Sequence, residues 1–293
     1  MKRAIGIAGA GRIGQAFGKL LYEAGLPVVA VASRNFERAS SAAEFIGAGI
    51  RPVRYEELPG WCSRVIIAVA DDAIRPVAGL LAACGFSEGL AVHTSGLHGP
   101  EALDALAAGG TSCAALHPLQ TAPTPEKGVK ALPGSVFVIS GDGEAADWAR
   151  ELVETLKGRP VEMAPESRRL YHATAVLGCN YLVVLIEAAR RTLAAARTDD
   201  ALLLAGLREL ALQAVENAFE NGRPLTGPLA RGDVETISAH LAALSQAGLV
   251  DIERLYREVA RFAVEIARRQ GLEESKAAEI DHLLDAPVGR KST

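Results

Sequence analysis

The stretch Ala4-Ile-Gly-Ile-Ala-Gly-Ala-Gly-Arg-Ile-Gly14 decides how this chain folds. Its apolar start predicts a buried strand, and Ile13 to Ala24, closed by Gly25, predicts a helix. In the turn between them, the first glycine permits a tight bend, the second lets the backbone approach a pyrophosphate, and the third lets the helix pack closely on the sheet. The free amides at the start of such a helix favour a phosphate. We expect a dinucleotide site formed by Gly9, Ala10, Gly11, Arg12, Ile13 and Gly14, the alternative being a turn that is merely rich in glycine.

Length and composition exclude several classes of protein. The chain has 293 residues, enough for about two domains, and 49% of them are hydrophobic, as in ordinary globular proteins. The net charge of −4 and the lack of a basic run argue against nucleic acid as a partner. The four cysteines lie far apart, which fits a reducing compartment and no structural zinc.

Two apolar segments bear on localisation. The run after Arg3 ends at Arg12, too early for a signal peptide. The most apolar stretch, 173–186, would rise only about 21 Å as a helix, whereas a bilayer core is about 30 Å thick. We therefore expect a cytoplasmic protein without a membrane partner, in which this stretch is buried in a domain core or in a dimer interface.

The secondary-structure pattern of the sequence changes near position 165. Before it, apolar runs alternate with helical patterns, which predicts a mostly parallel sheet flanked by helices. After it, we find only helical pattern, expected over 166–196, 200–221, 233–246, 251–270 and 273–284, with a turn-rich interruption at 221–228. The expected architecture is an α/β Rossmann-like, doubly wound domain, residues 1–164, followed by an all-helical domain, residues 165–293.

The end of the second predicted strand selects the cofactor. Sites for NAD usually place a carboxylate there to hold the ribose, whereas an arginine accommodates the additional phosphate of NADP. Here the strand ends at Ser33 and Arg34, and no carboxylate follows until Glu37. We expect NADP, with a solvated surface arginine as the alternative.

Further polar residues follow other predicted strands. Val69, Ala70 and Asp71 end one of them, and Asp71-Asp72 there either borders the cofactor or, the reading we favour, caps a helix that starts at Ala73. Ser95 and His117 end two more and are expected near the nicotinamide. The histidines of this region, His93, His98 and His117, lack the spacing of metal ligands, so we expect no metal and expect them to line the nicotinamide pocket instead.

Residues in the helical part are candidates for substrate chemistry. His172 and Asn180 lie eight residues apart, on broadly one side of a helix, so His172 could donate a proton while Asn180 holds a substrate oxygen. An interdomain hydrogen-bonded pair is an equal alternative. Arg231 could hold a substrate carboxylate, and Thr226 and Ser95 could orient the reacting oxygen. Asp233 is read as a helix cap.

Together, these segments resemble bacterial oxidoreductases that join a Rossmann-like NADP-binding domain to a helical domain of unknown function 2520. The residues that carry the resemblance are Gly9-x-Gly11-x-x-Gly14, Ser33-Arg34, Asp71-Asp72, His93-Thr-Ser95-Gly96, His117-Pro118, Tyr171-His172, Asn180-Tyr181, Leu225-Thr-Gly-Pro228 and Arg231-Gly-Asp233. The resemblance implies a fold of the 6-phosphogluconate dehydrogenase type, in which the helical domain covers the nicotinamide and often forms a dimer.

The resemblance also limits the chemistry. Conventional ketopantoate reductases carry a lysine followed by an asparagine on the first long helix of the second domain, and this chain has no lysine between Lys157 and Lys276. We expect an NADP-dependent enzyme that transfers a hydride to or from a small oxo or imino acid, ketopantoate included, and that forms a homodimer through its helical domain. The alternatives are a non-catalytic NADP-binding regulator and a deazaflavin-dependent NADP oxidoreductase.

Overall fold

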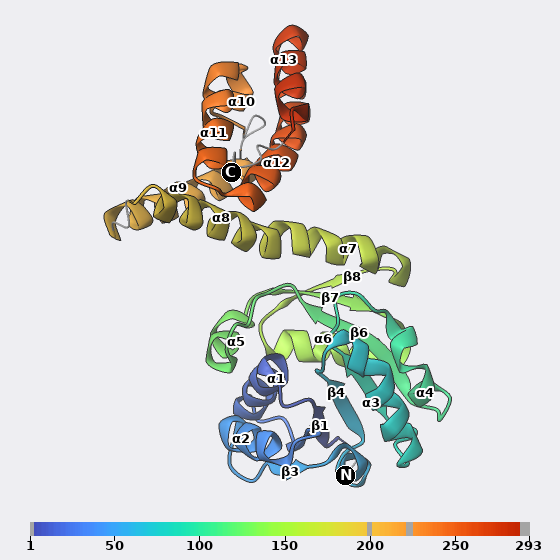
Figure 1. Ribbon diagram of the computed structural model, residues 1–293. Helices are drawn as coiled ribbons and strands as arrows, with labels where there is room; N and C mark the ends of the chain where they lie inside the picture. The colour runs from blue at the N-terminus through green and yellow to red at the C-terminus, as the bar shows by residue number, and fades with distance from the viewer. Residues whose placement is uncertain (1–2, 198–200, 221–224, 288–293) are drawn as a thin grey trace. The chain divides into compact units, whose positions relative to one another are not determined.

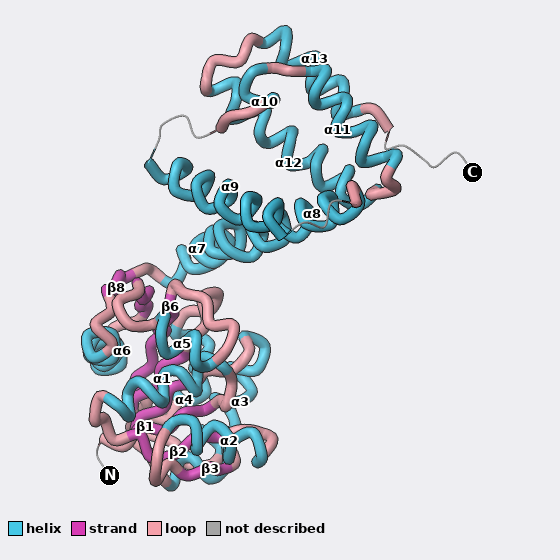
Figure 2. The backbone as a smooth tube through the Cα atoms, turned by 90° about the vertical axis from the view of Figure 1, so that its left-hand side faces the viewer, coloured by secondary structure: helices cyan, strands magenta, loops and turns pink. Residues whose placement is uncertain are grey.

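A computed structural model describes residues 3–197, 201–220 and 225–287. The chain forms two compact units, Met1–Leu177 and Gly178–Thr293. All strands of the described residues belong to the first unit, and the second is helical (Figures 1 and 2). The boundary between the units, at Leu177, lies C-terminal to position 165, where the strand-forming pattern of the sequence ends. The reason is that the first helix after position 165 packs on the sheet, through the contact of Tyr171 with His117.

The first unit is built on an eight-stranded sheet with the order β3-β2-β1-β4-β5-β6-β7-β8. All neighbours pair in parallel except β6 and β7. The order reverses between β1 and β4, and ligands of doubly wound sheets bind outside the carboxyl ends of the strands at such a point. The strands are β1 Ile5–Ala8, β2 Val28–Ala32, β3 Arg51–Val53, β4 Arg64–Ile67, β5 Leu90–His93, β6 Ser112–Pro118, β7 Val136–Ser140 and β8 Arg159–Glu162.

Helices cover both faces of this sheet, so that each face has its own apolar core. One core joins Phe17 and Trp148 to the strands, and the other joins Leu58 and Leu81 to them. Burial on both faces explains why the central strands are apolar runs rather than alternating patterns. The helices of this unit are α1 Arg12–Glu23, α2 Phe36–Ile46, α3 Asp71–Ala83, α4 Asp104–Ala107, α5 Pro125–Ala131, α6 Gly143–Thr155 and α7 Arg168–Ala175.

The expected α/β Rossmann-like fold with a helical C-terminal region is confirmed. The short strands β3 and β8 were not anticipated from the sequence. Both lie at an edge of the sheet, and β8 is exposed along its whole length. Its Arg-Pro-Val-Glu sequence therefore has no apolar run by which a strand is recognised.

The second unit contains a small core of its own. Ile237, Val264 and Ile280 are fully buried where three of its helices meet. The predicted helices are present, although the expected start at residue 200 and end at residue 221 of one of them lie outside the described residues. The elements are α8 Tyr181–Ala195, α9 Ala201–Glu220, α10 Pro228–Arg231, α11 Val234–Gln246, α12 Val250–Arg269 and α13 Glu274–Asp285.

The apolar segment 173–186 is not covered by this chain, contrary to one of the two expectations for it. Neither α8 nor α9 has a buried residue, so the domain core does not enclose this segment. Among the described residues, the helical run Pro165–Ala195 is long and apolar enough to cross a membrane. One such run is weak grounds for a membrane span, because core helices of soluble proteins pass the same test.

Candidate active site

The glycine turn has the geometry that a dinucleotide requires. Gly9 has a φ of +130°, which favours glycine, and a Cβ there would collide with the carbonyl oxygen of Ala68. A Cβ on Gly14 would collide with the carbonyl oxygen of Gly9. At Gly11, in contrast, the nearest atom to a Cβ would be 3.9 Å away, so that this backbone is open to a ligand. Helix α1 begins at Arg12 directly behind the turn, without an acidic residue in its first turn.

Ser33 and Arg34 follow β2 at the same edge of the sheet. The Ser33 hydroxyl accepts a hydrogen bond from the Asn35 amide at 3.3 Å, and Asn35 caps α2. Arg34 is exposed, and its charge acts on neighbouring Tyr55, whose pKa is nevertheless raised because burial outweighs that charge. The Arg34 guanidinium is thus available to a phosphate beside the adenosine position of a dinucleotide.

Val69, Ala70 and Asp71 lie just beyond β4, next to the glycine turn. The interpretation of Asp71-Asp72 as a cap is wrong, because α3 already begins at Asp71 and its cap residue is Ala70. The amide of Ala73 bonds to the carbonyl oxygen of Ala70, and neither aspartate side chain makes a capping bond. Asp71 instead places a carboxylate in the first turn of α3, where the helix dipole favours negative charge.

His93, at the end of β5, shapes a loop rather than lining a pocket. It is fully buried, accepts a bond from the Ser95 amide at Nδ1 (3.2 Å), and donates from Nε2 to the carbonyl oxygen of Gly99 (2.8 Å). The Ser95 hydroxyl accepts bonds from the amides of Leu97 and His98 at 3.0 and 3.1 Å. The imidazole of His93 and the hydroxyl of Ser95 therefore hold the 95–99 loop in place. A role of Ser95 in orienting a substrate remains a prediction.

Arg168, the first residue of α7, lies fully buried behind this loop. It donates from Nη1 to the Ser140 hydroxyl at 3.0 Å and from Nη2 to the carbonyl oxygen of Ser95. Its Nε has no partner, and no carboxylate of the described residues forms an ion pair with it. A cation buried without a counter-ion is costly, and it makes its surroundings electropositive.

His117, on β6, is the centre of a cluster that we call the histidine–tyrosine cluster, formed by His117, Tyr171 and His172. Its Nδ1 lies 2.7 Å from the hydroxyl of Tyr171. Both α7 rings meet the His117 ring edge-on, with centroids 5.6 Å away for Tyr171 and 6.3 Å for His172. Gly96 lies against them: a Cβ there would be 2.7 Å from His172 Nδ1 and 2.9 Å from His117 Nε2.

The electrostatics of the cluster keep two of its groups, His117 and Tyr171, neutral. Burial, and then the charge of Arg168, lower the pKa of His117 to about 4. Burial raises the pKa of Tyr171, so its hydroxyl retains its proton at neutral pH. The Nδ1 of His172 is enclosed and has no hydrogen-bond partner. A neutral imidazole such as that of His117, and a phenol, can each donate and accept a hydrogen bond, which is what proton transfer requires.

The remaining predicted residues belong to the second unit. Asp233 caps α11 as expected, since its Oδ1 accepts the Thr236 amide at 3.1 Å. Arg231 ends α10 and is exposed, as is Thr226. Asn180 ends a π-helical turn, Val176–Asn180, which separates it from His172. The α-helical spacing assumed for that pair is therefore wrong, because a π turn shifts the residues that follow it around the axis.

The sequence did not single out two residues of this site. Arg168 and Arg169 are adjacent arginines at the start of one helix, and only the fold shows that Arg168 is buried while Arg169 is exposed. Tyr171 was named only as part of the Tyr171-His172 pair that carries the family resemblance, and no role was assigned to it, because its partner His117 lies far away in the sequence.

Comparison with protein families gives two matches along the chain. The family described as NADP oxidoreductase coenzyme F420-dependent matches residues 4–90. The domain of unknown function (DUF2520) matches residues 135–280. The chain belongs to the family that joins these two domains. It is an NADP-dependent oxidoreductase, as the glycine turn and Arg34 predicted.

Solved structures share the fold over most of the chain. A protein from Bacteroides fragilis, named for an inferred NADP oxidoreductase activity, is 23% identical with a TM-score of 0.76, over 90% of this chain and 98% of that one. A reductive aminase from Aspergillus terreus, solved with NADPH, is 18% identical with a TM-score of 0.59, over 97% and 93%. An imine reductase from Streptomyces aurantiacus is 17% identical with a TM-score of 0.61, over 95% and 99%. A comparison with curated proteins gives no match.

The residues present fit NADP. The open backbone at Gly11 and the start of α1 suit its pyrophosphate, and the exposed guanidinium of Arg34 suits the phosphate on its ribose. The carboxyl ends of β5 and β6 then place the 95–99 loop and the histidine–tyrosine cluster at the same edge of the sheet as these groups.

Proposed function

We propose that the protein reduces a small oxo or imino acid, ketopantoate being one candidate, with His172 as the proton donor. NADPH, when bound, supplies the hydride. The observation that carries the proposal is the histidine–tyrosine cluster beside Gly96, at the cofactor edge of the sheet. With Nδ1 enclosed, the His172 ring has Nε2 left for a substrate atom.

An acidic substrate fits the charge of this region. Arg168 is a buried cation that pairs with no carboxylate among the described residues, and its positive potential favours an anion close by. Separately, in the second unit, Arg231 is an exposed guanidinium that can bind a carboxylate in bidentate fashion. Ser95, Asn180 and Thr226 are proposed to orient the reacting oxygen or nitrogen.

The test is NADPH oxidation by the purified protein with a panel of 2-oxo acids, their methyl esters and cyclic imino acids. We expect turnover of an acid and at least tenfold slower turnover of its ester. His172→Gln should lower kcat by about 100-fold or more, the usual contribution of a general acid. Turnover by His172→Gln at the rate of the unaltered protein would reject His172 as the donor, and no turnover of any acid or imine would reject the reaction class.

A second candidate function follows from the description of the N-terminal family, which names coenzyme F420. Here a deazaflavin would exchange a hydride with NADP in place of an oxo acid. An absorbance spectrum of the protein as purified, followed by NADPH oxidation with added F420, distinguishes the two. Binding of NADPH without turnover under either condition would favour a regulatory NADP-binding protein.

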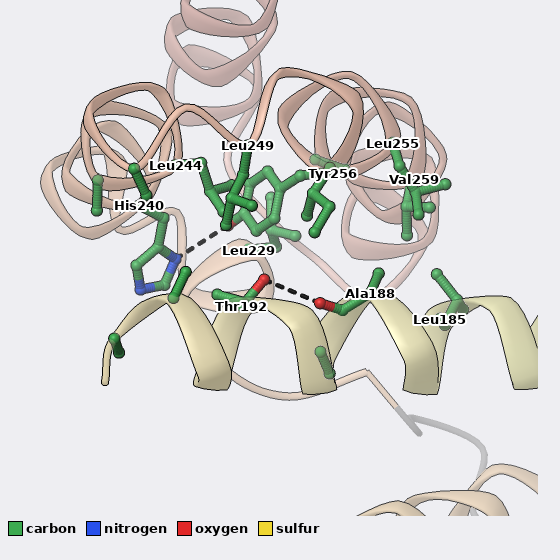
Figure 3. A pocket seen from close by; sticks show the side chains of 17 residues that line it. Leu185, Ala188, Thr192, Leu229, His240, Leu244, Leu249, Leu255, Tyr256 and Val259 are labelled. Atoms are coloured by element: carbon green, nitrogen blue, oxygen red, sulfur yellow. Dashed lines mark hydrogen bonds between the residues drawn. The ribbon is translucent and has the colours of Figure 1, made fainter. Parts of the chain in front are cut away.

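We further propose that the helical unit forms a homodimer. Val183 and Leu210 are 63% and 68% exposed on α8 and α9, two helices without buried residues. Helices this long gain most of their stability from packing an apolar face, so these two need a partner. An apolar pocket of about 590 Å³ lies between α8 and helices α11 and α12, lined by Leu185, Leu244 and Tyr256 among others (Figure 3).

The partner that we propose is a second copy, which presents the same apolar faces. Light scattering should give twice the chain mass of 30.7 kDa. Val183→Glu should yield monomers that still bind NADPH through the first unit. A protein that is monomeric at micromolar concentration, or that partitions into lipid vesicles, would contradict the proposal.

A further inference from the structure

The second and third strands of the sheet end side by side. β2 and β3 pair in parallel with Ala32 opposite Val53, and the Ser33 amide donates to the Val53 carbonyl oxygen at 3.3 Å. Neighbouring strands of a sheet lie about 4.8 Å apart, so the residues that follow these two strands emerge as neighbours at its carboxyl edge. Each strand is followed there by an arginine, Arg34 two residues beyond β2 and Arg54 one residue beyond β3.

Both arginine side chains are available to a ligand. Arg34 and Arg54 are exposed, and neither forms an ion pair within the described part of the chain. The carboxylate of Glu57 holds the main chain of Arg54, since its Oε2 accepts the Arg54 amide at 2.7 Å. Burial raises the pKa of Tyr55, the residue after Arg54, and the positive charge of Arg34 opposes that rise. Arg34 therefore lies within electrostatic reach of the turn that begins at Arg54.

We propose that Arg54 is a second guanidinium for the ribose phosphate of NADP, so that two adjacent strand ends, and not Arg34 alone, select NADP over NAD. This role rests on the position given to that phosphate beside Arg34, and it is independent of which substrate is reduced. A phosphate monoester carries a charge of about −1.5 to −2 at pH 7, more than one guanidinium neutralises. Arginine binds a phosphate through two parallel donors, and arginines from separate strands can bind different oxygens of one phosphate.

Two other interpretations of Arg54 compete with this one. β3 is an edge strand of the sheet, and charged side chains at an edge discourage pairing with another chain, so Arg54 could serve that purpose alone. Alternatively, exposed Arg38 on the first turn of α2 could supply the second guanidinium. Arg54 is favoured because the bond from Ser33 to Val53 ties the end of β3 directly to the residue before Arg34.

Calorimetric titration with ligands that differ only in the ribose phosphate tests the role of Arg54. The pairs are NADPH with NADH, and adenosine 2′,5′-bisphosphate with adenosine 5′-monophosphate, which leaves the nicotinamide position out of the measurement. In Arg54→Gln we expect the Kd of each phosphorylated ligand to rise about tenfold, the usual effect of losing a hydrogen bond to a charged group. The Kd of the other two should change less than twofold, which also shows that the variant is folded. An equal change for both members of each pair would overturn the proposal.

Two other arginines provide controls. Arg51 is an exposed residue of the same strand, and its guanidinium lies over the Trp61 ring, 4.3 Å from the ring centroid. Arg51→Gln should leave the Kd of all four ligands unchanged, because its side chain is engaged away from the end of β3. Arg38→Gln should behave in the same way. A rise for the phosphorylated ligands in Arg38→Gln, with none in Arg54→Gln, would overturn the proposal in favour of α2.

Phosphorus NMR of bound NADP reports on the ribose phosphate itself. A free phosphate monoester loses its second proton with a pKa of about 6, and adjacent guanidiniums favour the dianion and so lower that pKa. With NADP at saturating concentration, Arg54→Gln should return the pKa of the bound phosphate part of the way to its free value, and Arg51→Gln should not. The same phosphate pKa in Arg54→Gln as in the unaltered protein would overturn the proposal.

The double variant Arg34→Gln, Arg54→Gln distinguishes failure of this role from failure of Arg34. Side chains that bind one phosphate should act non-additively, so the rise in the Kd of NADPH should differ from the product of the two single effects. If Arg34→Gln raises that Kd and Arg54→Gln does not, Arg34 alone holds the phosphate. If neither variant raises it, the phosphate lies elsewhere and both roles fail. Failure of every oxo or imino acid to turn over would reject the proposed function and leave these binding measurements unaffected.

Discussion

Arg168 donates from its Nη2 to the main-chain carbonyl oxygen of Ser95, and this bond ties the first residue of α7 to the loop that follows β5. The same guanidinium reaches the Ser140 hydroxyl, which itself donates to the carbonyl oxygen of Met163 at 2.6 Å. One buried side chain thus links the C-terminal ends of β5, β7 and β8 beneath the histidine–tyrosine cluster.

Replacing this arginine should change the titration of its neighbours. Arg168→Met removes a positive charge that lowers the pKa of His93 and of His117, so both values should rise from about 4. They should stay below 6.5, because burial is the larger cause in both cases. Histidine NMR over a pH series measures the shift, with Arg169→Met, an exposed neighbour, as the control. Unchanged values in Arg168→Met would show that its charge is screened from both rings.

Gly96 should tolerate no side chain. In Gly96→Ala the new methyl group would lie 2.7 Å from His172 Nδ1 and 2.9 Å from His117 Nε2, so both rings have to move. Displacing catalytic groups by about 1 Å costs about 100-fold in rate, and we expect kcat to fall by that order while NADPH still binds. Gly79→Ala, on α3 where a Cβ would meet no atom within 4 Å, is the control and should retain full activity. Equal activity of the two variants would contradict the packing described here.

The sequence was sufficient for the fold because the deciding signals are local. Apolar runs, glycine turns and helical patterns each lie within about 20 residues, and they predicted the sheet and the helical unit. Edge strand β8 was not predicted because it is exposed along its whole length and therefore has no apolar run. The helix cap predicted at Asp71-Asp72 was wrong because aspartate is favoured both at the cap position and in the first turn of a helix.

The site was predictable only in part, for a similar reason. The glycine turn could be predicted from a single strand–turn–helix pattern, and Arg34 from its position at the end of the next strand. The bond between His117 and Tyr171 joins residues 54 positions apart and depends on how α7 packs on β6. Spacing rules also assume a regular helix, and the π-helical turn before Asn180 breaks that assumption.

Arg34 should set the preference for NADPH over NADH. Arg34→Asp removes a guanidinium from the position of the ribose phosphate and adds a negative charge there. Hydrogen bonds to charged groups contribute about 1.5–3 kcal/mol, so the Kd of NADPH should rise about 10- to 100-fold, with little change for NADH. Parallel calorimetric titrations measure both, and Arg254→Asp, exposed on α12, is the control. Equal weakening of both nucleotides would place Arg34 elsewhere than at that phosphate.

Stability should fall on mild acidification because of His93. Burial lowers its pKa from 6.5 to about 4 in the folded protein, so the unfolded state binds a proton that the folded state does not. Its contribution is present above pH 6.5 and is lost as the pH falls from 6.5 towards 4, by about 3 kcal/mol in all. Urea unfolding at several pH values measures this. Burial also lowers the pKa of His117 to about 4, which adds a dependence of the same sign, so His93→Asn should remove about half of the slope whereas exposed His282→Gln should remove none. An equally steep dependence in His93→Asn would assign it to other groups.

Arg257 and Glu253 form a buried ion pair within α12 of the second unit. Arg257 donates from Nη2 to Oε1 of Glu253 at 2.8 Å, and from Nη1 to the carbonyl oxygens of Leu283 and Leu284 at 3.0 Å. Glu253 is almost fully buried, and its other oxygen has no partner. Arg257→Met therefore leaves a buried carboxylate unpaired, which should lower the free energy of unfolding by about 3–5 kcal/mol.

The double variant Arg257→Met, Glu253→Leu separates the cost of that orphaned charge from the value of the pair. Replacing both members of a buried pair with apolar residues is often close to neutral, so the double variant should recover most of the lost stability. The carbonyl oxygen of Leu283 still loses its donor, and the recovery should be incomplete for that reason, whereas the carbonyl oxygen of Leu284 keeps a bond from Arg261 Nη2 at 2.8 Å. Urea unfolding of both variants provides the comparison, and a double variant no more stable than Arg257→Met would show that these carbonyl bonds, rather than the charge on Glu253, account for the effect.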